Sequence, residues 1–145
     1  MIQSTRQPAR PEPPRSTWIR GGDGAPERAR RLVIAQLDAD RSEAGAADAA
    51  LIVSELVTNS VRHASAGNHD GVVLELTTHD NHLRIAVVDQ GSPQVPHILP
   101  FDPATPGGFG LRLVEQLSSA WGVVQDGGGT TRVWCDVPLG DAAAL

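Results

Sequence analysis

The chain has 145 residues, about the size of one domain, and we expect no room for a second. Twelve arginines and no lysine stand against seventeen acidic residues, and the net charge of −5 argues against direct binding of nucleic acid. The single cysteine, Cys135, cannot form an internal disulfide, and we find neither a membrane-spanning apolar run nor a signal peptide. We therefore expect a cytoplasmic protein that does not contact a membrane.

The first quarter of the chain changes in character near Pro26. Residues 1–25 are rich in proline and arginine and poor in aliphatic side chains, which predicts a disordered tail. Pro26 suits the first turn of a helix, and the aliphatic residues after it recur at helical spacing to about Asp40. The tail is therefore expected to lead directly into a first helix.

A second helix is predicted from about Ala44 to Ala64. Its expected core face consists of small and aliphatic side chains: Ala46, Ala50, Val53, Val57, Ser60, Val61 and Ala64. The opposite face groups polar side chains in one arc: Glu55, Asn59, Arg62 and His63. Leu51 and Ile52 flank this polar arc, which suggests a lined pocket. Taken alone, the arc is better explained as a solvated helix face.

Two β-rich runs, residues 72–78 and 82–89, are joined by Asp80-Asn81, a strong turn signal, and predict a hairpin. Residues 90–110 hold five prolines and four glycines, and they form a loop far longer than the usual four to six residues. Loops of that length in a compact domain are usually functional lids or disordered segments. The end of this loop opens a third helix.

Two further β-rich runs, residues 122–124 and 130–138, predict a second hairpin. The order is therefore helix, helix, two strands, long loop, helix, two strands. This order predicts an α+β two-layer sandwich, with a mixed, mostly antiparallel sheet and helices on one face. We expect the domain to span residues 26–139, with residues 140–145 as a carboxy-terminal tail.

Three short motifs carry chemistry. Glu55 and Asn59 place a carboxylate, which can take a proton, one helical turn from a carboxamide oxygen suited to Mg²⁺. Asp89 and Gly91 end a buried strand, where a carboxylate can accept a hydrogen bond from an exocyclic amine and a glycine allows close approach; an ordinary turn is the alternative. The glycine-rich residues 107–110 open a helix and offer backbone N–H groups to phosphate oxygens; a flexible joint is the alternative.

Together, and in this order, the three motifs resemble the N, G1 and G2 boxes of the GHKL (Bergerat-fold) ATPases over about residues 26–139. The finer pattern is similar to the stand-alone regulators related to anti-sigma-factor serine/threonine kinases. Its segments read ELVTNSVRHA from Glu55, DQGSP from Asp89, GGFGL from Gly107 and GGTTRVW from Gly128.

The resemblance implies roles for individual residues. Asn59 would hold Mg²⁺ and Glu55 would be the catalytic base that deprotonates a serine hydroxyl. Asp89 would bind the adenine amine and Thr131 would support it through a water. The remaining implied contacts to ATP are Gly91 beside the ring, Arg62 and His63 at the phosphates, and Gly107, Gly108 and Gly110 around them. For His63, a solvated residue at the helix end is the alternative.

The resemblance also implies partners. The protein would bind a sigma factor and phosphorylate an anti-sigma-factor antagonist, and its first helix and sheet edge are surfaces that would support a homodimer. The glycine often found two residues beyond Gly91 is Pro93 here, and the loop is rich in proline. A lid that closes poorly would leave ATP bound but not consumed, so a non-catalytic ATP-binding regulator that sequesters a sigma factor or another partner is the alternative. The catalytic domain of a sensor histidine kinase is a third, less favoured hypothesis, because the chain has no room for a phospho-acceptor hairpin.

Overall fold

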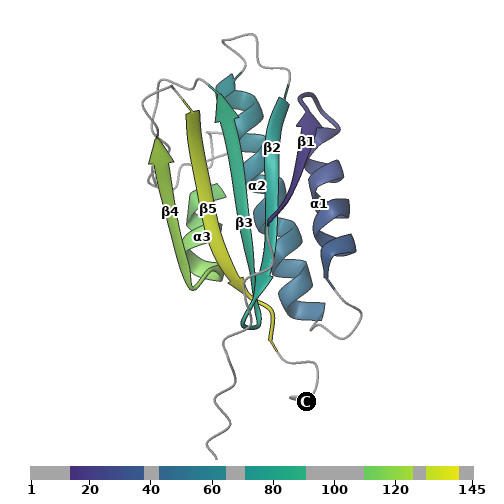
Figure 1. Ribbon diagram of the computed structural model, residues 1–145, viewed down its shortest axis with the longest axis vertical. Coiled ribbons are helices and arrows are strands. Elements are labelled where there is room, and N and C mark those ends of the chain that lie inside the picture. The colour runs from purple at the N-terminus through teal and green to yellow at the C-terminus, as the bar shows by residue number, and fades with distance from the viewer. Residues whose placement is uncertain (1–13, 38–42, 65–70, 91–109, 126–129, 141–145) are drawn as a thin grey trace, which may run out of the picture.

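The computed structural model describes residues 14–37, 43–64, 71–90, 110–125 and 130–140. These residues form three helices and one sheet, and the helices cover one face of the sheet (Figure 1). The elements are, in chain order, β1 (Arg15–Arg20), α1 (Ala25–Gln36), α2 (Glu43–Ala64), β2 (Gly71–His79), β3 (His82–Gln90), α3 (Gly110–Leu117), β4 (Ala120–Gln125) and β5 (Thr130–Pro138).

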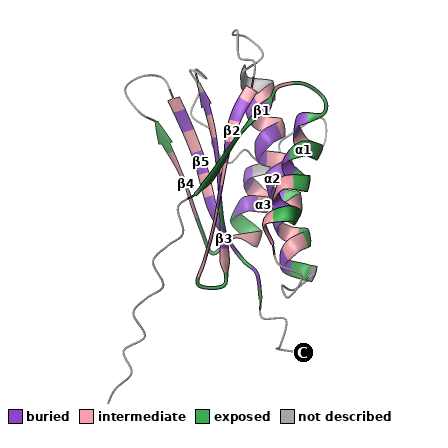
Figure 2. Cartoon of the chain, turned by 45° about the vertical axis from the view of Figure 1, so that its right-hand side comes forward, coloured by how far each residue is buried: buried purple, intermediate pink, exposed green. Residues whose placement is uncertain are grey.

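The sheet has five strands in the order β1-β2-β3-β5-β4, and each pair of neighbours is antiparallel. Figure 2 shows that the buried residues gather between this sheet and the helices. The predicted α+β two-layer sandwich, with helices on one face, is therefore confirmed. None of the described helices is long and apolar enough to cross a membrane.

The β2–β3 hairpin lies in the middle part of the sheet, and its turn determines where the residues at the end of β3 lie. Its two turn residues, Asp80 and Asn81, have φ angles of 42° and 66°. Positive φ at both central positions is the signature of a type I′ turn, whose twist matches that of the flanking strands, and Asp and Asn tolerate it better than other residues with a side chain. The turn fixes the register, so that Leu74 faces Val87 and both side chains are buried.

Helix α2 is the central helix and lies against α1, α3 and three strands. Its buried side chains include Ala49, Ile52 and Leu56 as well as the expected Val53 and Val57. The predicted core face is therefore too narrow and is rotated from the observed one. The reason is that α2 packs against neighbouring helices as well as the sheet, so that residues beside the sheet-facing stripe are also covered.

Some residues at the borders of the predicted core face of α2 are more exposed or more buried than expected. Ala46 and Ala50 are only half-buried. Of the two apolar residues expected to border the polar arc, Ile52 is fully buried, whereas Leu51 is 43% exposed. The polar arc of α2 is thus bordered by one core residue and one surface residue.

The prediction of a disordered tail is wrong for part of residues 1–25, because β1 pairs with β2 along its whole length. Within β1 only Ile19 is buried, so the strand lacks the apolar alternation by which strands are recognised. The Trp18 ring lies over Gly71 of the neighbouring strand, where a Cβ atom would meet the ring at 2.9 Å. Residues 15–20 therefore belong to the folded sheet. Helix α1 follows near the expected position, and residues 1–13 and 38–42 lie outside the described part.

Candidate functional site

Two polar residues occupy the helix-facing side of the sheet, where the other side chains are mainly apolar. Asp89, near the end of β3, is 6% exposed, and Thr131, near the start of β5, is 1% exposed. They lie directly opposite each other in the antiparallel ladder. The next pair on the same face, Val87 and Val133, belongs to the hydrophobic core. The sheet thus places a carboxylate and a hydroxyl side by side at the edge of the core.

A buried carboxylate such as Asp89 indicates a specific role, because ionised groups are rarely buried without compensating interactions. A carboxylate accepts hydrogen bonds, and a hydroxyl both donates and accepts them. Asp89 and Thr131 can therefore recognise a ligand edge that carries a hydrogen-bond donor beside an acceptor. This is the chemistry that the sequence pattern predicts for an adenine site.

The polar arc of α2 supplies the second part of the site. Glu55 and Asn59 lie one turn apart, and both residues are half-buried. Within the described part of the chain, neither side chain makes a hydrogen bond or an ion pair with another residue. The polar residues next to them on α2 do have partners within the helix. The Ser54 hydroxyl donates to the carbonyl oxygen of Leu51 at 2.9 Å, and the Thr58 hydroxyl donates to that of Ser54 at 2.7 Å. Glu55 and Asn59 are therefore available to a ligand.

The two parts of the site lie on elements that pack together. Helix α2 contacts both β3 and β5, and it ends at the end of the sheet where β3 finishes and β5 begins (Figure 1). The later part of α2, which carries Asn59, is therefore on the same end of the molecule as Asp89 and Thr131. This arrangement is what a nucleotide spanning from base to phosphates requires.

The other predicted site residues are placed less fully. Arg62 and His63 lie in the last turn of α2, and Gly110 is the first residue of α3. Gly91, Gly107 and Gly108 lie outside the described residues. The assignment of all these residues to a nucleotide site stays a prediction.

One neighbour of the site was not indicated by the sequence. Gln125, the last residue of β4, lies opposite Thr131, and its Nε2 atom donates a hydrogen bond to Thr131 Oγ1 at 3.4 Å. The contact depends on how β4 pairs with β5, and a glutamine at the end of a short strand gives no local signal of it. Gln125, Thr131 and Asp89 therefore form one row across three strands.

The donor set fits Mg²⁺-ATP. Mg²⁺ in nucleotide sites is usually held by one or two protein oxygens together with phosphate oxygens. The Asn59 carboxamide oxygen is such a ligand, and the Glu55 carboxylate one turn away is a proton acceptor. Asp89 supplies an acceptor for an exocyclic amine. These side chains would hold the two ends of a bound ATP.

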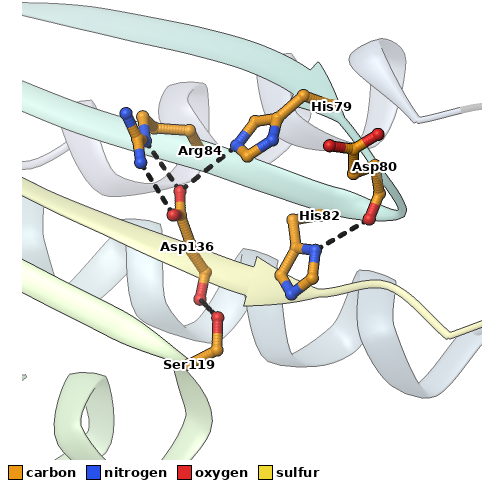
Figure 3. A network of polar contacts seen from close by, with 6 residues as sticks. All are labelled: His79, Asp80, His82, Arg84, Ser119 and Asp136. Atoms are coloured by element: carbon orange, nitrogen blue, oxygen red, sulfur yellow. Dashed lines mark hydrogen bonds and ion pairs between the residues drawn. The ribbon is translucent and has the colours of Figure 1, made fainter. Parts of the chain in front are cut away.

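A second polar cluster lies at the other end of the hairpin, on the sheet face that the helices leave open (Figure 3). Arg84 donates to both carboxylate oxygens of Asp136, from Nε at 2.7 Å and from Nη2 at 2.8 Å. His79 Nε2 lies 3.6 Å from Asp136 Oδ1, beyond hydrogen-bond distance. The Arg84 guanidinium also lies 4.8 Å from the centroid of the Trp134 ring.

The hydrogen bond from Arg84 lowers the pKa of Asp136, and burial of the carboxylate opposes this shift. Because β3 runs from His82 to Gln90, this cluster and Asp89 lie at opposite ends of the sheet. The two also lie on opposite faces, since Arg84 and Asp89 are an odd number of residues apart on one strand. The cluster therefore stabilises the sheet and is not part of the candidate site.

Comparison with known proteins identifies the family. The model of the histidine kinase-like ATPase domain matches residues 25–134, which is most of the chain. A search of curated proteins found no match. The matched segment contains α1, α2, the β2–β3 hairpin, α3 and β4, together with both halves of the candidate site. The chain therefore belongs to the family of histidine kinase-like ATPase domains, whose ligand is ATP.

Proposed function

We propose that the protein is an ATP-dependent serine/threonine protein kinase of the anti-sigma-factor type. It would phosphorylate a serine on an antagonist protein and so change which partner, antagonist or sigma factor, it holds. The observation that carries this proposal is the pairing of Glu55 with Asn59, one turn apart on the half-buried polar arc of α2. A proton acceptor beside a metal ligand is the minimum that phosphoryl transfer to a hydroxyl requires from the protein.

Bound Mg²⁺-ATP would supply the phosphoryl group and the positive charge that neutralises it. Asn59 would fix the metal through its carboxamide oxygen. Glu55 would accept the proton of the serine hydroxyl while the serine oxygen forms its bond to the γ-phosphorus and ADP leaves with the bridging oxygen. Arg62, His63 and the glycines at 91, 107, 108 and 110 would complete the nucleotide site as the motif pattern predicts. Asp89 and Thr131 would hold the base at the far end.

The experiment is a transfer assay with radiolabelled ATP, Mg²⁺ and a panel of anti-sigma-factor antagonist proteins. We expect label on a serine with the wild type and a loss of about 10²- to 10⁴-fold with Glu55→Gln, because a positioned base contributes that much. Asp48→Asn is the matched control, since Asp48 is another half-buried carboxylate on α2, seven residues from Glu55. It should leave transfer unchanged.

Nucleotide binding, measured in parallel by calorimetry, separates the alternatives. Glu55→Gln should still bind ATP, because the carboxylate acts on the acceptor hydroxyl. If the wild type binds ATP but transfers no label to any of the antagonists, the kinase proposal is wrong. The non-catalytic ATP-binding regulator would then be the better description.

A further inference from the structure

The row formed by Gln125, Thr131 and Asp89 continues the candidate site onto β4. Residues that face each other in an antiparallel pair point to the same side of the sheet. Both Gln125 and Asp89 face Thr131, one from each neighbouring strand. The row therefore lies on the helix-facing side, with Thr131 between the amide and the carboxylate.

The direction of the hydrogen bond from Gln125 determines what Thr131 can do on its other side. A threonine hydroxyl has one proton to donate and two lone pairs that accept. The Gln125 amide donates into one of these lone pairs. The hydroxyl proton is therefore not used on the Gln125 side and stays available to a ligand that binds beside Asp89.

We propose that Gln125 is a positioning residue for nucleotide selectivity: by donating to Thr131, it keeps that hydroxyl a donor beside the acceptor Asp89. This inference rests on the proposed ATP site. Adenine presents an amine donor beside a ring-nitrogen acceptor, whereas guanine presents a carbonyl acceptor beside a ring N–H donor. An acceptor next to a donor on the protein matches adenine and opposes guanine. Gln125 would thus favour ATP over GTP without touching the nucleotide.

The test reverses the polarity of the row. Gln125→Glu replaces the amide donor by a carboxylate that only accepts, so the Thr131 proton turns toward residue 125 and a lone pair is offered to the nucleotide instead. Gln125→Met removes the donor and retains the length of the side chain. Val124→Glu is the charge control, because Val124 is 52% exposed and its side chain points to the opposite face of β4. Circular dichroism melting confirms that each variant is folded.

The quantity measured is the ratio of the Kd for Mg²⁺-GTP to the Kd for Mg²⁺-ATP, obtained by displacement titration. We expect Gln125→Met to lower this ratio about fivefold, the effect of one neutral hydrogen bond, and Gln125→Glu to lower it tenfold or more. Val124→Glu should leave the ratio unchanged, because added negative charge affects both nucleotides equally. In a Thr131→Val background, the Gln125 substitutions should no longer change the ratio.

The outcomes separate this inference from the function on which it rests. If the wild type binds neither nucleotide, the proposed function is wrong and the inference fails with it. If the wild type prefers ATP and Gln125→Glu retains the wild-type ratio, the proposed function stands and the role of Gln125 is overturned. The same holds if Gln125→Glu changes the ratio equally with and without the Thr131 hydroxyl.

Discussion

Replacing Arg84 by methionine removes the guanidinium that binds Asp136 and retains much of the aliphatic stem that covers the sheet. In the folded protein, Asp136 would lose two charge-assisted hydrogen bonds, of 2.7 and 2.8 Å, and Trp134 would lose its cation. The Asp136 side chain is only 11% exposed, whereas that of Arg84 is 47% exposed. The pair is therefore half open to solvent, and its contribution must be reduced accordingly.

The magnitude follows from these contacts. Two hydrogen bonds to a charged group would contribute about 3 kcal/mol if they were fully buried. Solvent screening on the Arg84 side reduces this to about 1.5 kcal/mol, because exposed pairs contribute little. The cation–π contact adds about 0.5 kcal/mol at such a site. We therefore expect Arg84→Met to lower the free energy of unfolding by about 2 kcal/mol at pH 7.

The destabilisation caused by Arg84→Met should also depend on pH. The pKa of Asp136 is lowered in the folded state, so the pair contributes stability above the ordinary aspartate pKa of about 3.9 and loses it as the pH falls through the folded pKa. The difference between wild type and Arg84→Met should therefore shrink below about pH 4, toward the contribution of the Trp134 contact.

Urea unfolding at pH 7 and at several values below pH 4 measures both effects. Arg20→Met is the matched control, because Arg20 is exposed and has no acidic partner among the described residues; it should change stability by less than about 0.5 kcal/mol. A destabilisation by Arg84→Met that is equal at all pH values would refute the electrostatic account of this pair.

Three further predictions concern the core and the site. Gly45→Ala should destabilise the fold by about 1 to 3 kcal/mol in urea unfolding, because a Cβ would lie 2.5 Å from the Leu139 carbonyl oxygen; a neutral effect would mean that Leu139, the residue after β5, does not lie against Gly45 of α2. Cys135 is buried, and burial raises the pKa of its thiol to about 12, so a thiol reagent at pH 8 should label it only after unfolding; rapid labelling of the native protein would contradict this. Asn59→Ala should raise the Kd for ATP about tenfold or more in Mg²⁺ but little in EDTA, as calorimetry can show, and an equal loss in both would argue against a metal ligand.

The elements that the sequence predicts well are those with a strong local pattern. Asp80-Asn81 between two apolar runs predicts the β2–β3 hairpin and its turn. Apolar residues that recur at helical spacing predict α2, and the predicted first residue differs by one from the observed one. Strand β1 cannot be predicted from a local pattern, because Ile19 is its one buried residue and the strand is held in place by its pairing with β2. Its stability comes from a partner more than 50 residues away, which no window of sequence contains.

The candidate site divides in the same way. The one-turn spacing of Glu55 and Asn59 follows from helical geometry alone and needs no knowledge of the fold. That Asp89 faces Thr131, and that Gln125 joins them, depends on the order β3-β5-β4, in which the last two strands exchange places relative to the chain. The strand-end pattern indicated Asp89, and the resemblance to known ATPases indicated Thr131. Nothing in the local sequence supplied Gln125.

The buried end of the site gives the most direct test of ATP binding: calorimetric titration of the wild type and of Asp89→Asn with Mg²⁺-ATP. Asparagine keeps the size of the side chain and removes the charge, and Asp80→Asn, in the exposed turn at the other end of β3, is the control for lost charge. We expect the wild type and Asp80→Asn to bind one ATP per chain and Asp89→Asn to bind at least tenfold more weakly. A wild type that binds no ATP, or an Asp89→Asn variant that binds it as tightly as the wild type, would contradict the proposed site.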